Sequence, residues 1–253
     1  MLSIQYNQGY HKINNHRIYC KHCQNGQPTV IFESGLGDDS STWKEIQDEI
    51  SSITSTFSYD RAGTGKSESR DGPKSGIDIV QDLTKIVDNR SLGPPYILVG
   101  HSFGGLLSRL FASINPDNIA GMVLIDAAPV YKEISFQNIL TGKQKETIIK
   151  YLKNPSLNSE TVDKIKTYKQ ILKHKKKFDF PLTIIIRGLA KCYGPNWPED
   201  KLLEIEQELQ LDYKQLSENS KTVIAEKSGH YIHLDQPELV LEEIKEMVDK
   251  FNN

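Results

Sequence analysis

A serine stands between two glycines near the middle of the chain, in Gly100-His101-Ser102-Phe103-Gly104. The apolar run YILVG precedes it and an apolar helical pattern begins at Phe103, so we predict a sharp strand-to-helix turn at the serine. Glycines two residues to either side would prevent collisions at such a turn. This geometry would expose the Ser102 hydroxyl for nucleophilic attack. A glycine-rich turn with an incidental serine is the alternative interpretation.

A serine hydroxyl is a weak nucleophile near neutral pH and needs a histidine base that a carboxylate orients. Among seven histidines we favour His230, which follows the strand-like run TVIAE by four residues. His233 is the nearest rival, and we expect it to pack or to cap the last helix. His101 adjoins the nucleophile, but adjacent residues on a turn point apart. We place Gly35, Trp43, His101 and Tyr231 near a substrate pocket, although core packing is the default role for Trp43 and Tyr231.

The elements that must position these residues alternate between short β-branched or aromatic runs and longer amphipathic ones. This pattern predicts an α/β fold with a mostly parallel central sheet flanked by helices. We expect a hairpin from Tyr10–Ile13 and Arg17–Cys23 around Asn14-Asn15, because asparagine tolerates the left-handed turn. Six further strands are predicted at Thr29–Ser34, Thr56–Asp60, Tyr96–Gly100, Gly121–Asp126, Leu182–Arg187 and Thr222–Glu226. Helices are predicted at Thr42–Ser51, Ile77–Asp88, Phe103–Ile114, Glu199–Leu216 and Pro237–Phe251.

One region, residues 130–180, has a helical pattern without a strand. From Lys132 to Lys177 it holds twelve lysines against four acidic residues. We expect a lysine-rich helical cap inserted into a core formed by residues 1–129 and 181–253. Solvated helix faces explain the lysines more simply than a dedicated anion site, and a preference for anionic substrates is kept as a hypothesis.

Four motifs in a fixed order resemble the α/β-hydrolase family across essentially the whole chain. They are Ser34-Gly35-Leu36-Gly37, Asp60–Ser67, GHSFGG and SGHYIHLDQPELV. The resemblance implies an oxyanion hole formed by the backbone N–H groups of Leu36 and Phe103. It also implies that Asp60 and Arg61 order a loop near the site entrance. Ser34 replaces a histidine often found before that glycine, which should leave the backbone donor intact.

The position of the predicted triad acid differs from the one that is commoner in this family. Many members carry it a few residues after the strand that matches LTIIIR, where this chain reads GLAKCYG. Asp126 ends the strand GMVLID, and some branches of the family, including the haloalkane dehalogenases, place their acid there. We therefore favour Asp126. Capping of the chain as it leaves the sheet is its other possible role, and Asp200 is the alternative acid.

The leading functional prediction is a cofactor-independent serine hydrolase. Ser102, His230 and Asp126 would cleave a small carboxylic ester or lactone through an acyl-enzyme. Thioesterase, amidase or acyltransferase chemistry on the same site stays open. A ligand-binding or signalling protein with little turnover is the alternative from another class, and the missing carboxylate after LTIIIR favours it.

Charge and motif chemistry argue against several other classes. The chain has 253 residues with 31 Lys and Arg against 33 Asp and Glu, so we expect no nucleic-acid partner. Gly65-Lys66-Ser67 suggests a phosphate loop, but Asp60 occupies the first glycine position and Gly72 and Pro73 disfavour the required helix. Cys20 and Cys23 lie on a predicted strand and lack a second ligand pair, so we expect no metal.

The expected partner is a small-molecule acyl substrate, with no membrane partner. No run of about 18 apolar residues occurs, and Met1–Tyr6 show no basic segment followed by an apolar stretch. Three cysteines are too few for a disulfide framework. These features predict a cytoplasmic protein and leave the oligomeric state open.

Overall fold

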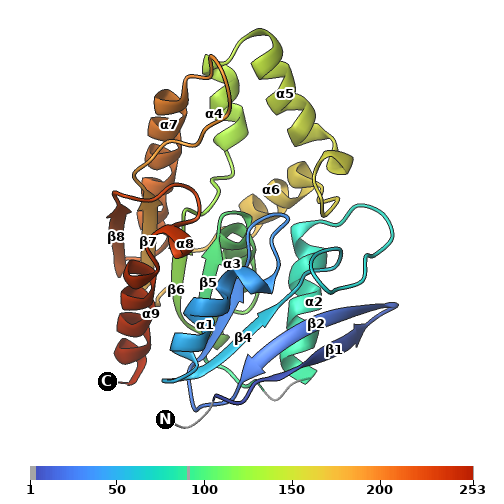
Figure 1. Ribbon diagram of the computed structural model, residues 1–253, viewed down its shortest axis with the longest axis vertical. Helices are drawn as coiled ribbons and strands as arrows, with labels where there is room; N and C mark the ends of the chain where they lie inside the picture. Colours follow the sequence, from blue (N-terminus) through green and yellow to red (C-terminus); the bar gives the residue numbers. More distant parts are fainter. Residues whose placement is uncertain (1–3, 90–91, 253) are drawn as a thin grey trace.

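The computed structural model describes residues 4–89 and 92–252 and is built around one eight-stranded sheet (Figure 1). The strand order is β1-β2-β4-β3-β5-β6-β7-β8. β1 and β2 form the expected antiparallel hairpin, with Asn14 in the left-handed region at φ 52°. β2 also pairs antiparallel with β4, and all later pairs are parallel. The strands are β1 (Asn7–Ile13), β2 (His16–Cys23), β3 (Thr29–Glu33), β4 (Ser55–Tyr59), β5 (Tyr96–His101), β6 (Ile119–Ile125), β7 (Leu182–Arg187) and β8 (Ser220–Ala225).

Helices cover both faces of the sheet, because neighbouring strand residues point to opposite sides. Ile31 of β3 packs in the cluster with α2 and α3, whereas Val30 and Phe32 pack with α1 and α9. The structure thus confirms the predicted mostly parallel α/β sheet flanked by helices. The core helices are α1 (Lys44–Ile50), α2 (Gly76–Asn89), α3 (Phe103–Ile114), α7 (Glu199–Leu211), α8 (Ile232–Asp235) and α9 (Pro237–Asn252). Short 3-10 turns are η1 (Ser40–Trp43), η2 (Pro116–Asn118) and η4 (Asp212–Leu216).

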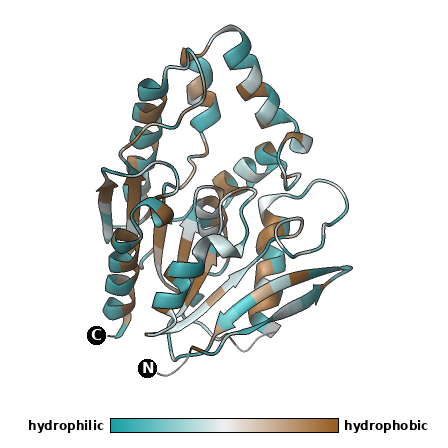
Figure 2. Ribbon diagram, in the orientation of Figure 1, coloured by the Kyte–Doolittle hydropathy of each residue, from teal (hydrophilic) through white to brown (hydrophobic). Residues whose placement is uncertain are grey.

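The central strands are apolar and buried, and Figure 2 shows brown strands beneath helices of mixed colour. β8 differs, because it lies at the sheet edge and most of its residues are only partly buried. Ile224 remains 41% exposed there. The last strand is therefore less covered than the strands in the interior of the sheet.

Residues 130–180 hold α4 (Lys132–Ile139), α5 (Gly142–Lys153), η3 (Pro155–Leu157) and α6 (Lys164–Lys173). Figure 1 shows these helices beyond the carboxyl ends of the parallel strands. A second segment joins them, because Leu202 of α7 packs in one apolar cluster with Phe136 and Leu140. The helical layer above the sheet, which we call the cap, is thus built from residues 130–180 together with part of α7.

Met1–Ser3, which belong to the N-terminal prediction, lie outside the described residues. Across residues 4–89 and 92–252, the structure has no helix both long and apolar enough to span a bilayer.

Candidate active site

Ser102 occupies the predicted turn between β5 and α3, with φ 52° and ψ −118°. This backbone conformation is strained for a residue with a side chain. A Cβ at position 100 would lie 2.7 Å from Gly105 Cα, and one at position 104 would collide with the Glu33 carbonyl. The turn is pinned because the Ser102 N–H donates to Ile125 O at 3.0 Å. Glycines are therefore needed on both sides of the serine, as the sequence indicates.

His230 and Asp126 meet at the carboxyl edge of the sheet. Asp126 follows β6 and also has a positive φ, 41°. The His230 ring donates from Nδ1 to Asp126 Oδ2 at 2.5 Å. Asp126 is buried and His230 is partly exposed, so the imidazole is anchored on one side and accessible on the other.

Ser102 and His230 line the same cavity, but the structure records no hydrogen bond between Ser102 Oγ and any described residue. Nucleophile-to-base hydrogen bonds are often long or poorly aligned before substrate binds. The site therefore pairs the His230 imidazole with the Asp126 carboxylate and places Ser102 on the wall of the cavity that His230 also lines.

Asp126 accepts three hydrogen bonds, so it is held in one orientation. Gln210 Nε2 donates to Oδ1 at 2.9 Å, and Arg187 Nη1 donates to Oδ2 at 2.6 Å beside His230. Burial alone would raise the pKa of Asp126, but the His230 hydrogen bond and the Arg187 charge outweigh it and hold that pKa well below its usual range. Asp126 is therefore ionised throughout the neutral range. Asp200, the alternative acid, is instead exposed in the first turn of α7.

Leu36 and Phe103 both line the cavity. Neither backbone N–H group donates a hydrogen bond to a described residue, so each is available to a ligand. Phe103 opens α3, whose aligned peptide dipoles place partial positive charge at this end. This arrangement can hold an anionic oxygen.

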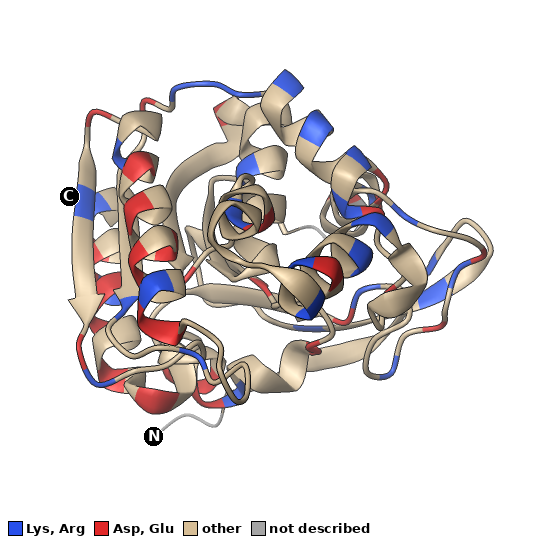
Figure 3. Cartoon of the chain, turned by 90° about the horizontal axis from the view of Figure 1, so that it is seen from above, with Lys and Arg blue, Asp and Glu red and all other residues tan. Residues whose placement is uncertain are grey.

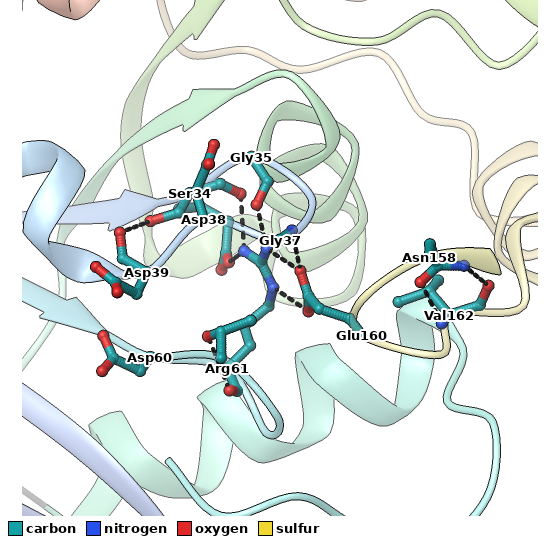
Figure 4. A network of polar contacts seen from close by, with 12 residues as sticks. Ser34, Gly35, Gly37, Asp38, Asp39, Asp60, Arg61, Asn158, Glu160 and Val162 are labelled. Carbon is teal, nitrogen blue, oxygen red and sulfur yellow. Dashed lines mark hydrogen bonds and ion pairs between the residues drawn. The ribbon is translucent and has the colours of Figure 1, made fainter. Parts of the chain in front are cut away.

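Arg61 fixes the loop that carries Leu36 (Figure 4). Its Nη1 donates to Ser34 O at 2.7 Å and its Nη2 to Gly35 O at 2.5 Å. The same guanidinium pairs with Glu33 at 2.9 Å. Arg61 therefore orders this loop by binding its backbone carbonyl groups directly.

Glu160, from the loop between η3 and α6, completes this arrangement on the cap side. Its Oε1 accepts from the Gly37 N–H at 2.7 Å and from Arg61 at 2.6 Å, and Lys74 lies 3.1 Å from Oε2. Burial would raise the pKa of Glu160, but Arg61 and Lys74 lower it to about 2. We call Glu33, Arg61, Lys74 and Glu160 the Arg61 network.

The cavity has a volume of about 430 Å³ and lies between the core and the cap. Two of the four expected pocket residues, Gly35 and Tyr231, line it. Trp43 and His101 do not, so their expected placement at the pocket is wrong. Both are fully buried.

Trp43 and His101 instead support the site from behind. Trp43 donates from Nε1 to Ser34 Oγ at 3.0 Å and stacks on His233 at 4.5 Å. His101 donates from Nε2 to the His230 carbonyl at 2.8 Å. Burial lowers the pKa of His101 well below its usual range and that of His233 to about 3, so both rings stay neutral. Packing is therefore the role of His233, as expected.

The sequence reasoning missed the charged partners of the site. Arg187, Glu206 and Glu160 are almost fully buried. Arg187 had a visible signal, because a charge ends the apolar strand LTIIIR where burial demands a partner. Glu160 and Glu206 had none, since they lie in surface-like stretches.

Cys20 and Cys23 are buried on β2, and no group of three or more potential metal ligands occurs among the described residues.

Comparisons with known proteins identify the family of this fold. A family model described as the alpha/beta hydrolase fold matches residues 28–173. The uncharacterized protein YqjL of Bacillus subtilis is 28% identical over 84% of this chain and 80% of its own. Human monoglyceride lipase is 28% identical over 76% of this chain and 65% of its own.

Solved structures share the fold. That of a putative lipase from Acinetobacter baumannii has a TM-score of 0.70 at 20% identity, covering 97% of this chain and 91% of that one. That of the epoxide hydrolase CorEH has a TM-score of 0.69 at 14% identity, covering 98% of this chain and all of that one.

Proposed function

The chain belongs to the α/β-hydrolase fold family, and on that premise we propose that it is a serine hydrolase that cleaves small carboxylic esters through an acyl-enzyme on Ser102. The observation that carries the proposal is the 2.5 Å contact from His230 Nδ1 to Asp126, beside a strained serine that shares the cavity with His230. A histidine fixed in this tautomer leaves Nε2 free to act as a base.

The proposed reaction begins when Ser102 Oγ attacks the substrate carbonyl carbon and His230 Nε2 takes the hydroxyl proton. The Leu36 and Phe103 N–H groups stabilise the oxygen that becomes negative. His230 then returns the proton to the departing alkoxide, which leaves the acyl group on Ser102. Water repeats the cycle with His230 as base and frees the serine. Asp126, ionised and held by Arg187 and Gln210, stabilises the imidazolium in both halves.

Esters are the favoured class because an alkoxide departs more readily than an amine. Human monoglyceride lipase and a monkeypox virus monoglyceride lipase homolog are among the relatives, and both are named after lipases, which cleave esters. The monkeypox virus protein is 30% identical over 54% of this chain. Thioester or amide cleavage and acyl transfer would use the same residues.

The test measures p-nitrophenol release from acetate, butyrate and octanoate esters by the wild type and by Ser102→Ala, with a fluorophosphonate label to report serine reactivity. Turnover and labelling should disappear together in the variant. Turnover that survives in Ser102→Ala would overturn the assignment of the nucleophile. A folded wild type that neither labels nor turns over would favour the ligand-binding alternative instead.

The triad acid is tested with Asp126→Asn, and Asp200→Asn serves as the matched control. Asp126→Asn should lower kcat by about four orders of magnitude, because the histidine loses the partner that fixes its tautomer. Circular dichroism should show a folded variant, because asparagine is isosteric and can still accept hydrogen bonds. Asp200→Asn should match the wild type. The reverse result would assign the acid to Asp200.

A further inference from the structure

Three lysines from three separate segments line the cap side of the cavity: Lys132 at the start of α4, Lys164 at the start of α6 and Lys191 in the loop after β7. Figure 3, which looks down on the molecule from above, shows Lys and Arg on several turns of the helices in view. Most lysines of residues 130–180 are exposed. Lys132 and Lys164 are instead turned inward, with side chains 20% and 7% exposed.

Two of these lysines have a buried carboxylate partner. Glu133 pairs with Lys164 and also accepts from the Tyr168 hydroxyl at 3.1 Å. Glu206 lies 3.0 Å from Lys132 and also pairs with Arg187. Arg187 also forms an ion pair with a second carboxylate, that of Asp126. We call Lys132, Glu133, Lys164, Lys191 and Glu206 the cap cluster.

Lys191 forms no ion pair or hydrogen bond with a described residue. Its Nζ lies 5.4 Å from the centre of the Tyr193 ring, which is a weak contact. Burial and the charge of Lys132 lower the pKa of Lys191 more than the charges of Glu206 and Asp126 raise it. Neither carboxylate forms an ion pair with Lys191. The cap cluster thus has three cations for two carboxylates, and adding Arg187 with Asp126 leaves that excess of one unchanged.

Asp38 is the remaining acidic residue on the cavity wall. It belongs to the loop after β3 and accepts from the Tyr231 hydroxyl at 3.3 Å. Its charged neighbours are Arg61, His230 and Glu160, and none of the cap lysines is among them. Burial raises the pKa of Asp38, so this carboxyl is a poor counterion for the cap cluster. The excess positive charge remains at the cap end.

We propose that the substrate carries a carboxylate remote from the bond that is cleaved, and that Lys191, flanked by Lys132 and Lys164, binds it. This inference rests on the proposed function. A single carboxylate matches an excess of one positive charge. Phe136, Ile148 and Trp197 line the cavity too and offer apolar surface to a short chain between the carboxylate and the reacting carbonyl. The substrate class is therefore a half-ester of a dicarboxylic acid, or an ester whose alcohol part is acidic.

The experiment compares charged esters with neutral analogues of nearly equal size. On the acyl side, p-nitrophenyl adipate and suberate half-esters are compared with the corresponding ω-carboxamides. On the leaving side, para-butyryloxybenzoate is compared with para-butyryloxybenzamide. Each ratio of kcat/KM, charged over neutral, is measured at an ionic strength of about 0.15 M, where the screening length is about 8 Å.

Lys191→Met removes the charge and keeps a flexible apolar side chain. Lys176→Met is the matched control, since it removes one exposed lysine from the same insertion and Lys176 does not line the cavity. In the wild type the kcat/KM ratio of charged to neutral ester should be about ten or more for either the acyl-side pair or the leaving-side pair. A charge-assisted hydrogen bond accounts for a ratio of this size. Lys191→Met should bring that ratio close to one, and Lys176→Met should leave it at the wild-type value.

The two proposals fail in different ways. Active enzyme with a ratio near one for both sides would overturn the carboxylate proposal and leave the hydrolase intact. A high ratio that Lys176→Met lowers as much as Lys191→Met would assign the effect to overall charge and also overturn it. No turnover of any ester, with no labelling of Ser102, would instead overturn the proposed function.

Discussion

The Arg61 network and the cap cluster both join the cap to the core through charged side chains, but they differ in their balance of positive and negative charge. The network has two cations and two carboxylates, and all four residues are at most 2% exposed. The cap cluster has three cations and two carboxylates, and its lysines border the cavity. The first is neutral and closed, whereas the second is positive and open to a ligand.

This difference shows how the same residue types serve two purposes. A buried charge is costly unless it is paired and hydrogen-bonded, so a closed network must be neutral. In return it holds the loop of Gly35 and Gly37 in one position. A cluster beside a cavity can leave one charge unmatched, because water solvates it until a ligand arrives. The network therefore positions the loop of Gly35 and Gly37, and we propose that the cap cluster recognises the carboxylate of the substrate.

The largest effect is expected for Glu160→Gln, which breaks the balance of the closed network. Arg61 and Lys74 would lose one of their carboxylate partners in an almost fully buried site, which should lower the free energy of unfolding by about 3 kcal/mol. Because Glu160 also accepts from the Gly37 N–H, kcat should fall more than KM rises. Urea unfolding and steady-state kinetics measure both. Wild-type stability in the variant would show that the network contributes nothing to the fold.

The same carboxylate makes stability depend on pH. The folded-state pKa of Glu160 is lowered from 4.5 to about 2, so the unfolded chain binds this proton first as the pH falls. Its stabilising contribution is complete above about pH 4.5 and is lost as the pH falls towards 2.

The urea midpoints of the wild type and Glu160→Gln should therefore converge over this interval. Burial raises the pKa of Glu33, which acts in the opposite direction, and the charge of Glu160 adds to that shift. A gap between the midpoints that stays constant from pH 6 to about pH 2.5 would contradict the assignment.

A smaller effect is expected for Glu133→Gln, the corresponding change in the cap cluster. Lys164 loses its partner beside a cavity that water can enter, so unfolding should become easier by only about 1–2 kcal/mol. The excess positive charge grows by one, and the preference for carboxylate-bearing esters should rise a few-fold. Equal destabilisation by Glu133→Gln and Glu160→Gln would remove the distinction between the two regions.

Local patterns in the sequence were sufficient for most of the fold. Strand and helix periodicity, the glycines around Ser102 and the Asn14-Asn15 turn depend on neighbours within a few residues. Every predicted strand from β3 to β8 is present, with ends that differ by no more than two residues. The predicted helix Glu199–Leu216 ends instead at Leu211 and continues as a 3-10 turn.

The sequence by itself determined the α/β class and the turn that carries Ser102, because backbone conformation follows from local periodicity and glycine placement. His230 was favoured from its place after a predicted strand, and Asp126 from the resemblance to the α/β-hydrolase family. Only the tertiary structure decided that His230 contacts Asp126, that Trp43 and His101 lie behind the site, and that Arg61 reaches Glu160, 99 residues away along the chain. Only the tertiary structure, too, brought Lys191 under the influence of the Lys132 charge and left it without an ion pair among the described residues. Charge compensation acts through space, so no spacing along the chain could reveal it.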